Sequence, residues 1–383
     1  MPFPHGLLLP ILRWATLGLL ALTGGLVLVG TILQYRKDRQ NRHRIACYQA
    51  WETQLTDYLF KKGYEHGSFG PVSWADRWLF RDFLARYQST IAGQEFELLR
   101  DLYLGMGLHA SLPQRLKDRD PNVRAQAAKE ISVFRLDEPA EHAPPPVTER
   151  PWRWKPGVRM EGYLDQVLPL LDDPVPFVAH TAAQALTHSR SLRFAAPVLT
   201  WVMREELYQR ERLLRVLEGF GPDLLPWMKE NLESPNQNPE PWILYALLVG
   251  SHRHRESLPR LLWLLDVPSV DLRASVLKAL IILADPEVYP RVLSFAASPA
   301  WEIRAQVARA LGVLGGPSAV PDLLPLMTDP VFEVRRNAAQ SLVDLGHSGV
   351  SALSWLADDP ASDRFARDIA RERLEWADER GHL

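Results

Sequence analysis

Apolar residues recur along most of the chain with the three- and four-residue spacing of amphipathic helices. The spacing is most regular in the C-terminal half, where SPAWEIRAQVARALGVLG is followed by TDPVFEVRRNAAQSLVDLG. Both stretches carry a proline, then an aliphatic residue next to an arginine, then Ala and Leu positions that end at glycine. The pattern predicts helices throughout this half and an internal repeat.

The repeat has a fixed length over its clearest copies. Arg273, Arg304 and Arg335 stand 31 residues apart. The aliphatic residue and arginine recur at Val123-Arg124, Leu272-Arg273, Ile303-Arg304 and Val334-Arg335. Between these stretches lie partner helices whose first turns contain Pro259, Pro290 and Pro321, also 31 apart, where a missing N–H costs nothing. The expected unit is a pair of helices that buries its core only against its neighbours.

The units resemble HEAT repeats, specifically the short bacterial PBS lyase HEAT-like variety, over roughly residues 111–376. The resemblance implies an all-α fold, an α-solenoid of about eight HEAT-like helix pairs. It indicates the fold far better than the function, because one fold serves many functions.

The N-terminal region predicts a membrane anchor. Residues 14–33 contain no charge, and a helix of this length rises about 30 Å, the thickness of a hydrocarbon core. A basic run follows, formed by Arg36, Lys37, Arg39, Arg42 and Arg44. The run predicts contact with anionic lipid head groups and a cytoplasmic C-terminal domain. We therefore expect a single-pass protein of the inner or plasma membrane.

Small residues in the predicted span, such as Ala21 and Gly25, leave two readings open. The span is either a plain anchor or a surface that packs on another transmembrane helix to form a homo-oligomer.

The pattern divides the chain into three parts: residues 1–44 as the anchor and basic run, 45–110 as a helical adaptor, and 111–383 as the repeats. In the adaptor, Ser73 starts SWADRWLFRDFLARY and is expected to cap a helix with an aromatic stripe.

A proline-rich insertion at 137–157 interrupts the repeats, and its composition excludes a helix. It contains Trp152, Arg153 and Trp154, residue types that are common in binding hot spots. The insertion is either a candidate protein-binding element or a tolerated surface loop.

The repeated arginines Arg273, Arg304 and Arg335 also allow two interpretations. They form a structural ladder tied to turn carbonyls or acidic groups, or they form an anion-binding stripe extended by Lys278 and Arg309. The acidic groups expected as partners are Asp271, Glu302 and Glu333.

Composition narrows the function classes. Lys and Arg total 44 against 46 for Asp and Glu, and acidic residues are interspersed through every repeat, which argues against nucleic-acid binding. The single cysteine, Cys47, excludes an internal disulfide framework and a cysteine-rich zinc site.

The sequence contains none of the common phosphate-binding, zinc-protease or serine-hydrolase motifs. His252 and His254 flank an arginine, whose positive charge disfavours a metal ion. The pairs Asp172-Asp173 and Asp358-Asp359 precede prolines, which favours a helix-capping role over acid–base catalysis. We expect no catalysis, no metal and no cofactor.

The leading hypothesis is a membrane-anchored, non-catalytic scaffold that presents a cytoplasmic surface to a protein partner. Its resemblance to bacterial HEAT-repeat membrane proteins implies an envelope complex for glycosyl transfer or polysaccharide export. The alternative, also implied by the resemblance, is chromophore attachment of the PBS lyase kind or another small-ligand-binding role.

Overall fold

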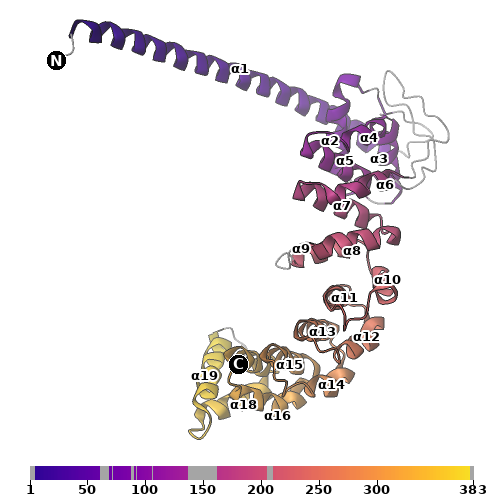
Figure 1. Cartoon of the computed structure of the whole chain (residues 1–383), viewed down its shortest axis with the longest axis vertical. Helices are drawn as coiled ribbons and strands as arrows, with labels where there is room; N and C mark the ends of the chain where they lie inside the picture. The colour runs from indigo at the N-terminus through magenta and orange to yellow at the C-terminus, as the bar shows by residue number, and fades with distance from the viewer. Residues whose placement is uncertain are drawn as a thin grey trace. The chain divides into compact units, whose positions relative to one another are not determined.

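In the computed structural model the chain is all-α (Figure 1). The structure describes residues 5–60, 69–70, 72–87, 90–91, 93–105, 107–136, 162–204 and 210–379. These residues form two compact units, the first from Met1–Asp118 and Val133–Tyr163 and the second from Arg119–Ser132 and Leu164–Leu383. The proline-rich insertion at 137–157 lies outside the described residues.

The first unit contains one long helix and several short ones. They are α1 (His5–Phe60), η1 (Trp74–Asp76), α2 (Arg77–Tyr87), α3 (Gln94–Gly105), η2 (Leu108–Ser111) and α4 (Leu112–Arg115). The Ser73 side chain accepts a hydrogen bond from the Ala75 N–H at 3.3 Å, which confirms the predicted cap at the start of η1.

An aromatic cluster forms the core where α1 meets α2. Trp51 packs edge-on against Phe80, with ring centroids 5.0 Å apart, and Phe83 contacts both rings. All three side chains are buried. The predicted aromatic stripe is therefore core at Phe83, whereas Trp74 remains 46% exposed.

The prediction of a transmembrane anchor at 14–33 is not upheld. Among the residues that the structure describes, no helix combines the length and the apolar character needed to cross a membrane. This finding overturns the predicted single-pass topology and inner-membrane localisation.

The second unit begins with α5 (Pro121–Val133) and continues as pairs of helices. The first helices are α6 (Tyr163–Val167) with η3 (Leu168–Asp172), α8 (Ala195–Arg204), α10 (Leu224–Asn231), α12 (Leu258–Leu264), α14 (Tyr289–Leu293), α16 (Val320–Leu323) with η9 (Leu324–Thr328), and α18 (His347–Asp358). The second helices are α7 (Pro176–His188), α9 (Arg210–Glu218), α11 (Glu240–Ser251), α13 (Val270–Leu283), α15 (Trp301–Leu314), α17 (Phe332–Asp344) and α19 (Arg364–Glu379). Short 3-10 turns precede several first helices, namely η4 (Leu192–Phe194), η6 (Arg255–Ser257), η7 (Pro286–Val288) and η8 (Gly316–Ala319).

The second helices stack on one another in chain order, α11 on α13, α13 on α15, α15 on α17 and α17 on α19. Figure 1 shows α12, α14 and α16 in one layer and α11, α13 and α15 in the other. Alanines at the contacts let the helices approach closely: Ala308 and Ala338 are fully buried, as are Val307 and Leu342. Each helix pair thus supplies one wall of its neighbour's core, as the repeat predicts.

Pro259, Pro290 and Pro321 all lie in the first turn of a helix, on α12, α14 and α16. The first backbone N–H groups of a helix have no partner within it, so proline is tolerated there. The predicted all-α repeat fold is confirmed, and it places the second helices side by side in a common register.

Candidate functional site

Each of the three repeated arginines donates to the turn before its own helix. Arg273 Nε lies 2.8 Å from the Leu265 carbonyl oxygen, and Arg304 Nη1 lies 2.8 Å from that of Ser298. Arg335 Nη1 lies 2.6 Å from the carbonyl oxygen of Asp329. Arg335 is buried, and these bonds bind the turn to the helix that follows it.

Arg304 also reaches the turn of the next repeat. Its Nε lies 2.6 Å from Asp329 Oδ2 and its Nη2 lies 2.9 Å from Asp329 Oδ1, a bidentate ion pair. The two side chains are 14% and 6% exposed. We call an arginine that bonds both its own turn and the aspartate of the next turn an arginine tie.

The pair changes the acidity of its members. Burial raises the pKa of Asp329, but hydrogen bonds from Arg304 and from the Val331 N–H outweigh it, so the pKa lies below its usual range. The same hydrogen bond to Asp329 raises the pKa of Arg304. Both groups are therefore charged at neutral pH.

Arg124 and Asp173 form a second arginine tie with the same atoms. Arg124 Nε lies 2.7 Å from Asp173 Oδ2 and Nη2 lies 2.8 Å from Oδ1, while Nη1 donates to the Arg119 carbonyl oxygen. Asp173 Oδ1 accepts from the Val175 N–H at 3.0 Å, as Asp329 does from Val331. The hydrogen bond from Arg124 is the main cause that lowers the pKa of Asp173.

The acidic partner in these ties differs from the predicted ones. The described hydrogen bonds of Arg304 go to Asp329 and to turn carbonyls, whereas Glu302, one position before Ile303 on the same helix, was the expected partner. Asp271 and Glu333 occupy the equivalent positions on α13 and α17 and are exposed. The geometry assigns the guanidinium groups to holding turns together.

Lys278 on α13 and Arg309 on α15 are exposed. The arginines with which they were grouped are engaged by turns, so the five residues do not form one row of available cations. Arg36, Lys37, Arg39, Arg42 and Arg44 are exposed along α1. Trp152, Arg153 and Trp154 lie outside the described residues.

Asp173 and Asp359 both accept a backbone N–H two residues further along, from Val175 and Ala361. These bonds support the interpretation of the Asp-Pro positions as turn and helix caps rather than acid–base groups. His254 Nδ1 lies 2.9 Å from Ser257 Oγ, within hydrogen-bond distance. His254 Nε2 lies 3.8 Å from Glu256 Oε2.

An exposed apolar row runs along the N-terminal ends of the stacked second helices. We define the apolar row as Val270, Trp301, Phe332 and Phe365. The first three are the opening residues of α13, α15 and α17, and Phe365 is the second residue of α19. Exposure ranges from 40% at Trp301 to 59% at Phe365, although the side chains are large and apolar.

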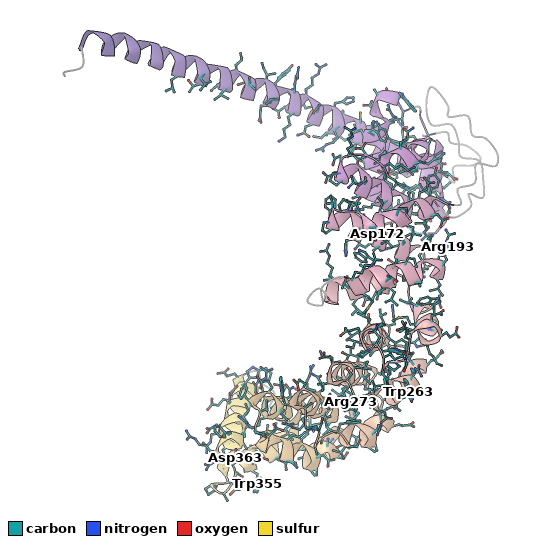
Figure 2. The ribbon with its side chains drawn as sticks, in the orientation of Figure 1. Asp172, Arg193, Trp263, Arg273, Trp355 and Asp363 are labelled. Atoms are coloured by element: carbon teal, nitrogen blue, oxygen red, sulfur yellow. The ribbon has the colours of Figure 1, made fainter. Side chains whose placement is uncertain are left out.

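Other exposed tryptophans lie outside the apolar row. Figure 2 shows Trp263 beside α12 and Trp355 beside α18, both first helices. Trp263 is 44% exposed and carries the Arg260 guanidinium 4.1 Å from its ring centroid. It is therefore a matched reference for Trp301, similar in exposure but not repeated from unit to unit.

Sequence reasoning missed the apolar row although its signal is present, since Val270, Trp301 and Phe332 stand 31 apart. The 31-residue spacing does not distinguish these exposed residues from core residues two positions later, such as the fully buried Ile303, which recur with the same spacing. Their exposure follows from the tertiary stacking. Sequence reasoning also missed a group of side chains of metal-binding type, formed by His43, Cys47 and Asp76.

Comparison with known proteins agrees with the repeat. Residues 289–375 match the family model described as HEAT repeats. The matched segment runs from the start of α14 to Glu375 within α19. A search of curated proteins finds no match for the chain.

Solved structures similar to this chain are distant. Human deoxyhypusine hydroxylase in complex with glycerol is 17% identical, with 72% of this chain and 98% of that chain covered and a TM-score of 0.27. The CpcE–CpcF complex of phycocyanin lyase from Nostoc sp. PCC7120 is 15% identical, covers 70% and 94%, and has a TM-score of 0.25. An engineered protein is 14% identical, covers 70% and 77%, and has a TM-score of 0.33. These similarities carry no argument about activity.

Proposed function

We propose that the protein is a non-catalytic scaffold whose second unit docks an extended segment of a protein partner along the apolar row. The observation that carries this proposal is the recurrence of a large exposed apolar residue at one position of successive repeats. Scattered exposed apolar residues are normal on a protein surface, but a row in register is not. The expected role in an envelope complex depended on the membrane anchor and is not part of the proposal.

Charge beside the row indicates the chemistry of the partner. Val270, Trp301 and Phe332 are each followed by an acidic residue. These residues are Asp271, Glu302 and Glu333. At three of its four positions the row therefore has a negative group next to the apolar one, which favours a partner segment that alternates apolar and basic side chains.

Spacing indicates the conformation of that segment. Neighbouring packed helices generally lie about 8–10 Å apart, so we expect equivalent residues on the stacked helices α13, α15 and α17 to repeat at about that distance. A polyproline II segment presents every third side chain on one face, and three residues rise about 9 Å. The occupant that fits is an extended segment with an apolar residue at every third position and Lys or Arg between them.

A peptide selection tests the proposal. A random 12-residue library is selected on the full-length protein and counter-selected on the double variant Trp301→Ser, Phe332→Ser. We expect enriched peptides with the apolar and basic pattern, and a loss of binding of at least about tenfold on the double variant, because truncating two exposed anchors removes more than about 1.4 kcal/mol.

The matched control is Trp263→Ser, which removes a similarly exposed tryptophan outside the row. It should leave the affinity unchanged. No enrichment, or enriched peptides that bind the double variant as tightly as the natural sequence, would refute docking at this row. Far-UV circular dichroism on each variant separates a lost surface from a lost fold.

A further inference from the structure

Three side chains of metal-binding type meet in the first unit. His43 and Cys47 are four residues apart on α1, so they lie on one helix face, and Asp76 is the last residue of η1. His43 Nε2 lies 2.8 Å from Asp76 Oδ1 and 3.6 Å from Cys47 Sγ. The candidate ligand atoms all lie within 4.8 Å of one another. Within the described residues, His43, Cys47 and Asp76 are the group of three metal-binding side chains whose ligand atoms lie this close together.

The distances suit a tetrahedral ion. Zinc binds sulfur at about 2.3 Å and nitrogen or oxygen at about 2.0–2.2 Å, so ligand atoms on one tetrahedral ion lie about 3.3–3.7 Å apart. The separation of His43 Nε2 and Cys47 Sγ falls in this range. Asp76 Oδ1 lies closer to His43 Nε2 than this range because the two atoms share a hydrogen bond, which a bound ion would replace.

The ligand set and its charge favour a divalent transition metal. Thiolate, imidazole and carboxylate are the zinc ligands of proteins, and a hard cation such as Mg²⁺ does not take sulfur. A thiolate and a carboxylate together cancel the charge of a divalent ion.

The surroundings are partly shielded from water. Cys47 and Asp76 are half-buried, and His43 is exposed. Burial, and after it the negative charge of Asp76, raises the pKa of the Cys47 thiol.

We propose that His43, Cys47 and Asp76 form a zinc site with three protein ligands, the fourth position being filled by water. The ion would clamp α1 to the start of α2, because the ligands come from α1 and from the turn that leads into α2. The proposal is independent of docking at the apolar row, which lies in the other unit.

Cobalt substitution tests the site on the full-length protein. Co²⁺ bound to a thiolate gives an intense near-ultraviolet charge-transfer band, and Cys47 is the single cysteine of the chain, so the band reports this residue alone. We expect the band to saturate at one Co²⁺ per chain, with tetrahedral visible bands, and to disappear when Zn²⁺ is added.

The variants separate the ligands. Cys47→Ser should abolish the band and weaken zinc binding by more than about 100-fold, since losing a ligand exceeds the 10- to 100-fold effect of losing a ligand's own hydrogen-bond partner. His43→Gln and Asp76→Asn should keep a weaker, shifted band, because the thiol remains. These two variants keep the test valid if Cys47→Ser fails to fold.

The control is His254→Gln, which removes another histidine that lies beside a carboxylate. It should leave the band and the zinc affinity unchanged. No thiolate band at a tenfold excess of Co²⁺, or equal zinc affinity in the natural protein and Cys47→Ser, would overturn the site and leave His43 and Asp76 as a plain surface ion pair.

Discussion

The arginine tie of Arg124 with Asp173 and that of Arg304 with Asp329 join the same atoms across very different lengths of chain. The paired residues are 49 apart in the first tie and 25 apart in the second. In both, Nε and Nη2 hold the carboxylate, Nη1 holds a turn carbonyl, and the aspartate accepts the N–H two residues on. An inserted segment in the sequence has left the contact between repeats unchanged.

Arg304 and Trp301 lie on the same helix, α15, but in different environments. The side chain of Arg304 is turned into the stack and engaged by two turns, whereas Trp301, one turn earlier on α15, faces solvent. The arginines hold the turns of the repeats, and Arg335 also lies over the rings of Phe332 and Phe365, 5.9 and 5.1 Å from their centroids. Each prediction below tests the equivalence of the two ties or their contrast with exposed groups.

The largest expected effect is loss of a tie. Arg304→Ala and Arg124→Ala should each lower the free energy of unfolding by about 3 kcal/mol, because each leaves a shielded carboxylate without its cation. Urea unfolding followed by circular dichroism measures both. Values that differ by more than about 1 kcal/mol would show that the two ties are not equivalent.

Acid should remove the contribution of the arginine ties to the free energy of unfolding. The pKa values of Asp173 and Asp329 lie below their ordinary value of 3.8, so the ionised forms favour the folded state. This stability is present above about pH 4 and is lost as the pH falls through the lower folded-state pKa values. Asp329→Asn should therefore destabilise the protein by about 2 kcal/mol at pH 7 and by less at pH 3.

The measurement is a pair of urea titrations at pH 7 and pH 3 on the natural protein and Asp329→Asn. An equal difference at both values would contradict the assignment of the stabilising form to the carboxylate. Asp358→Asn is the matched control, since it changes an aspartate of another Asp-Pro turn without removing the turn's own cap, Asp359.

An exposed ion pair with a similar N–O distance should contribute much less to the free energy of unfolding. Arg204 Nη1 lies 2.7 Å from Asp172 Oδ1, but the side chains are 64% and 74% exposed. Arg204→Ala should change the free energy of unfolding by less than about 1 kcal/mol. A loss equal to that of Arg304→Ala would mean that burial does not explain the strength of the ties.

The smallest effect on the free energy of unfolding is expected from shortening the proline-rich insertion. Replacing residues 137–157 by a Gly/Ser linker of about eight residues should change the free energy of unfolding by less than about 1 kcal/mol, because loop-closure entropy depends weakly on length. The same urea titration measures it. A large loss would show that the insertion contributes contacts to the fold.

The repeat could be predicted from the sequence because stacking in register imposes the same apolar pattern on every unit. The 31-residue spacing located α13, α15 and α17 and the prolines of their partner helices. The expected anchor at 14–33 was wrong, since no helix among the described residues is long and apolar enough to cross a membrane.

The partners of side chains were harder to predict than the helices. Asp329 lies in the following repeat, so its contact with Arg304 depends on how two turns meet in space, while the local alternative, Glu302, is nearer in sequence. Asp76 meets His43 from 33 positions away. The spacing of His43 and Cys47 predicts a shared helix face, but the contact with Asp76 depends on how η1 packs against α1.

The most direct test of docking is site-specific photocrosslinking with a peptide obtained from the selection. Benzoylphenylalanine is placed at Trp301 in one variant and at Trp263 in another, two positions of similar exposure. The account predicts a crosslink from position 301, competed by unlabelled peptide, and none from position 263. Equal crosslinking at both positions, or crosslinking at 263 alone, would contradict it.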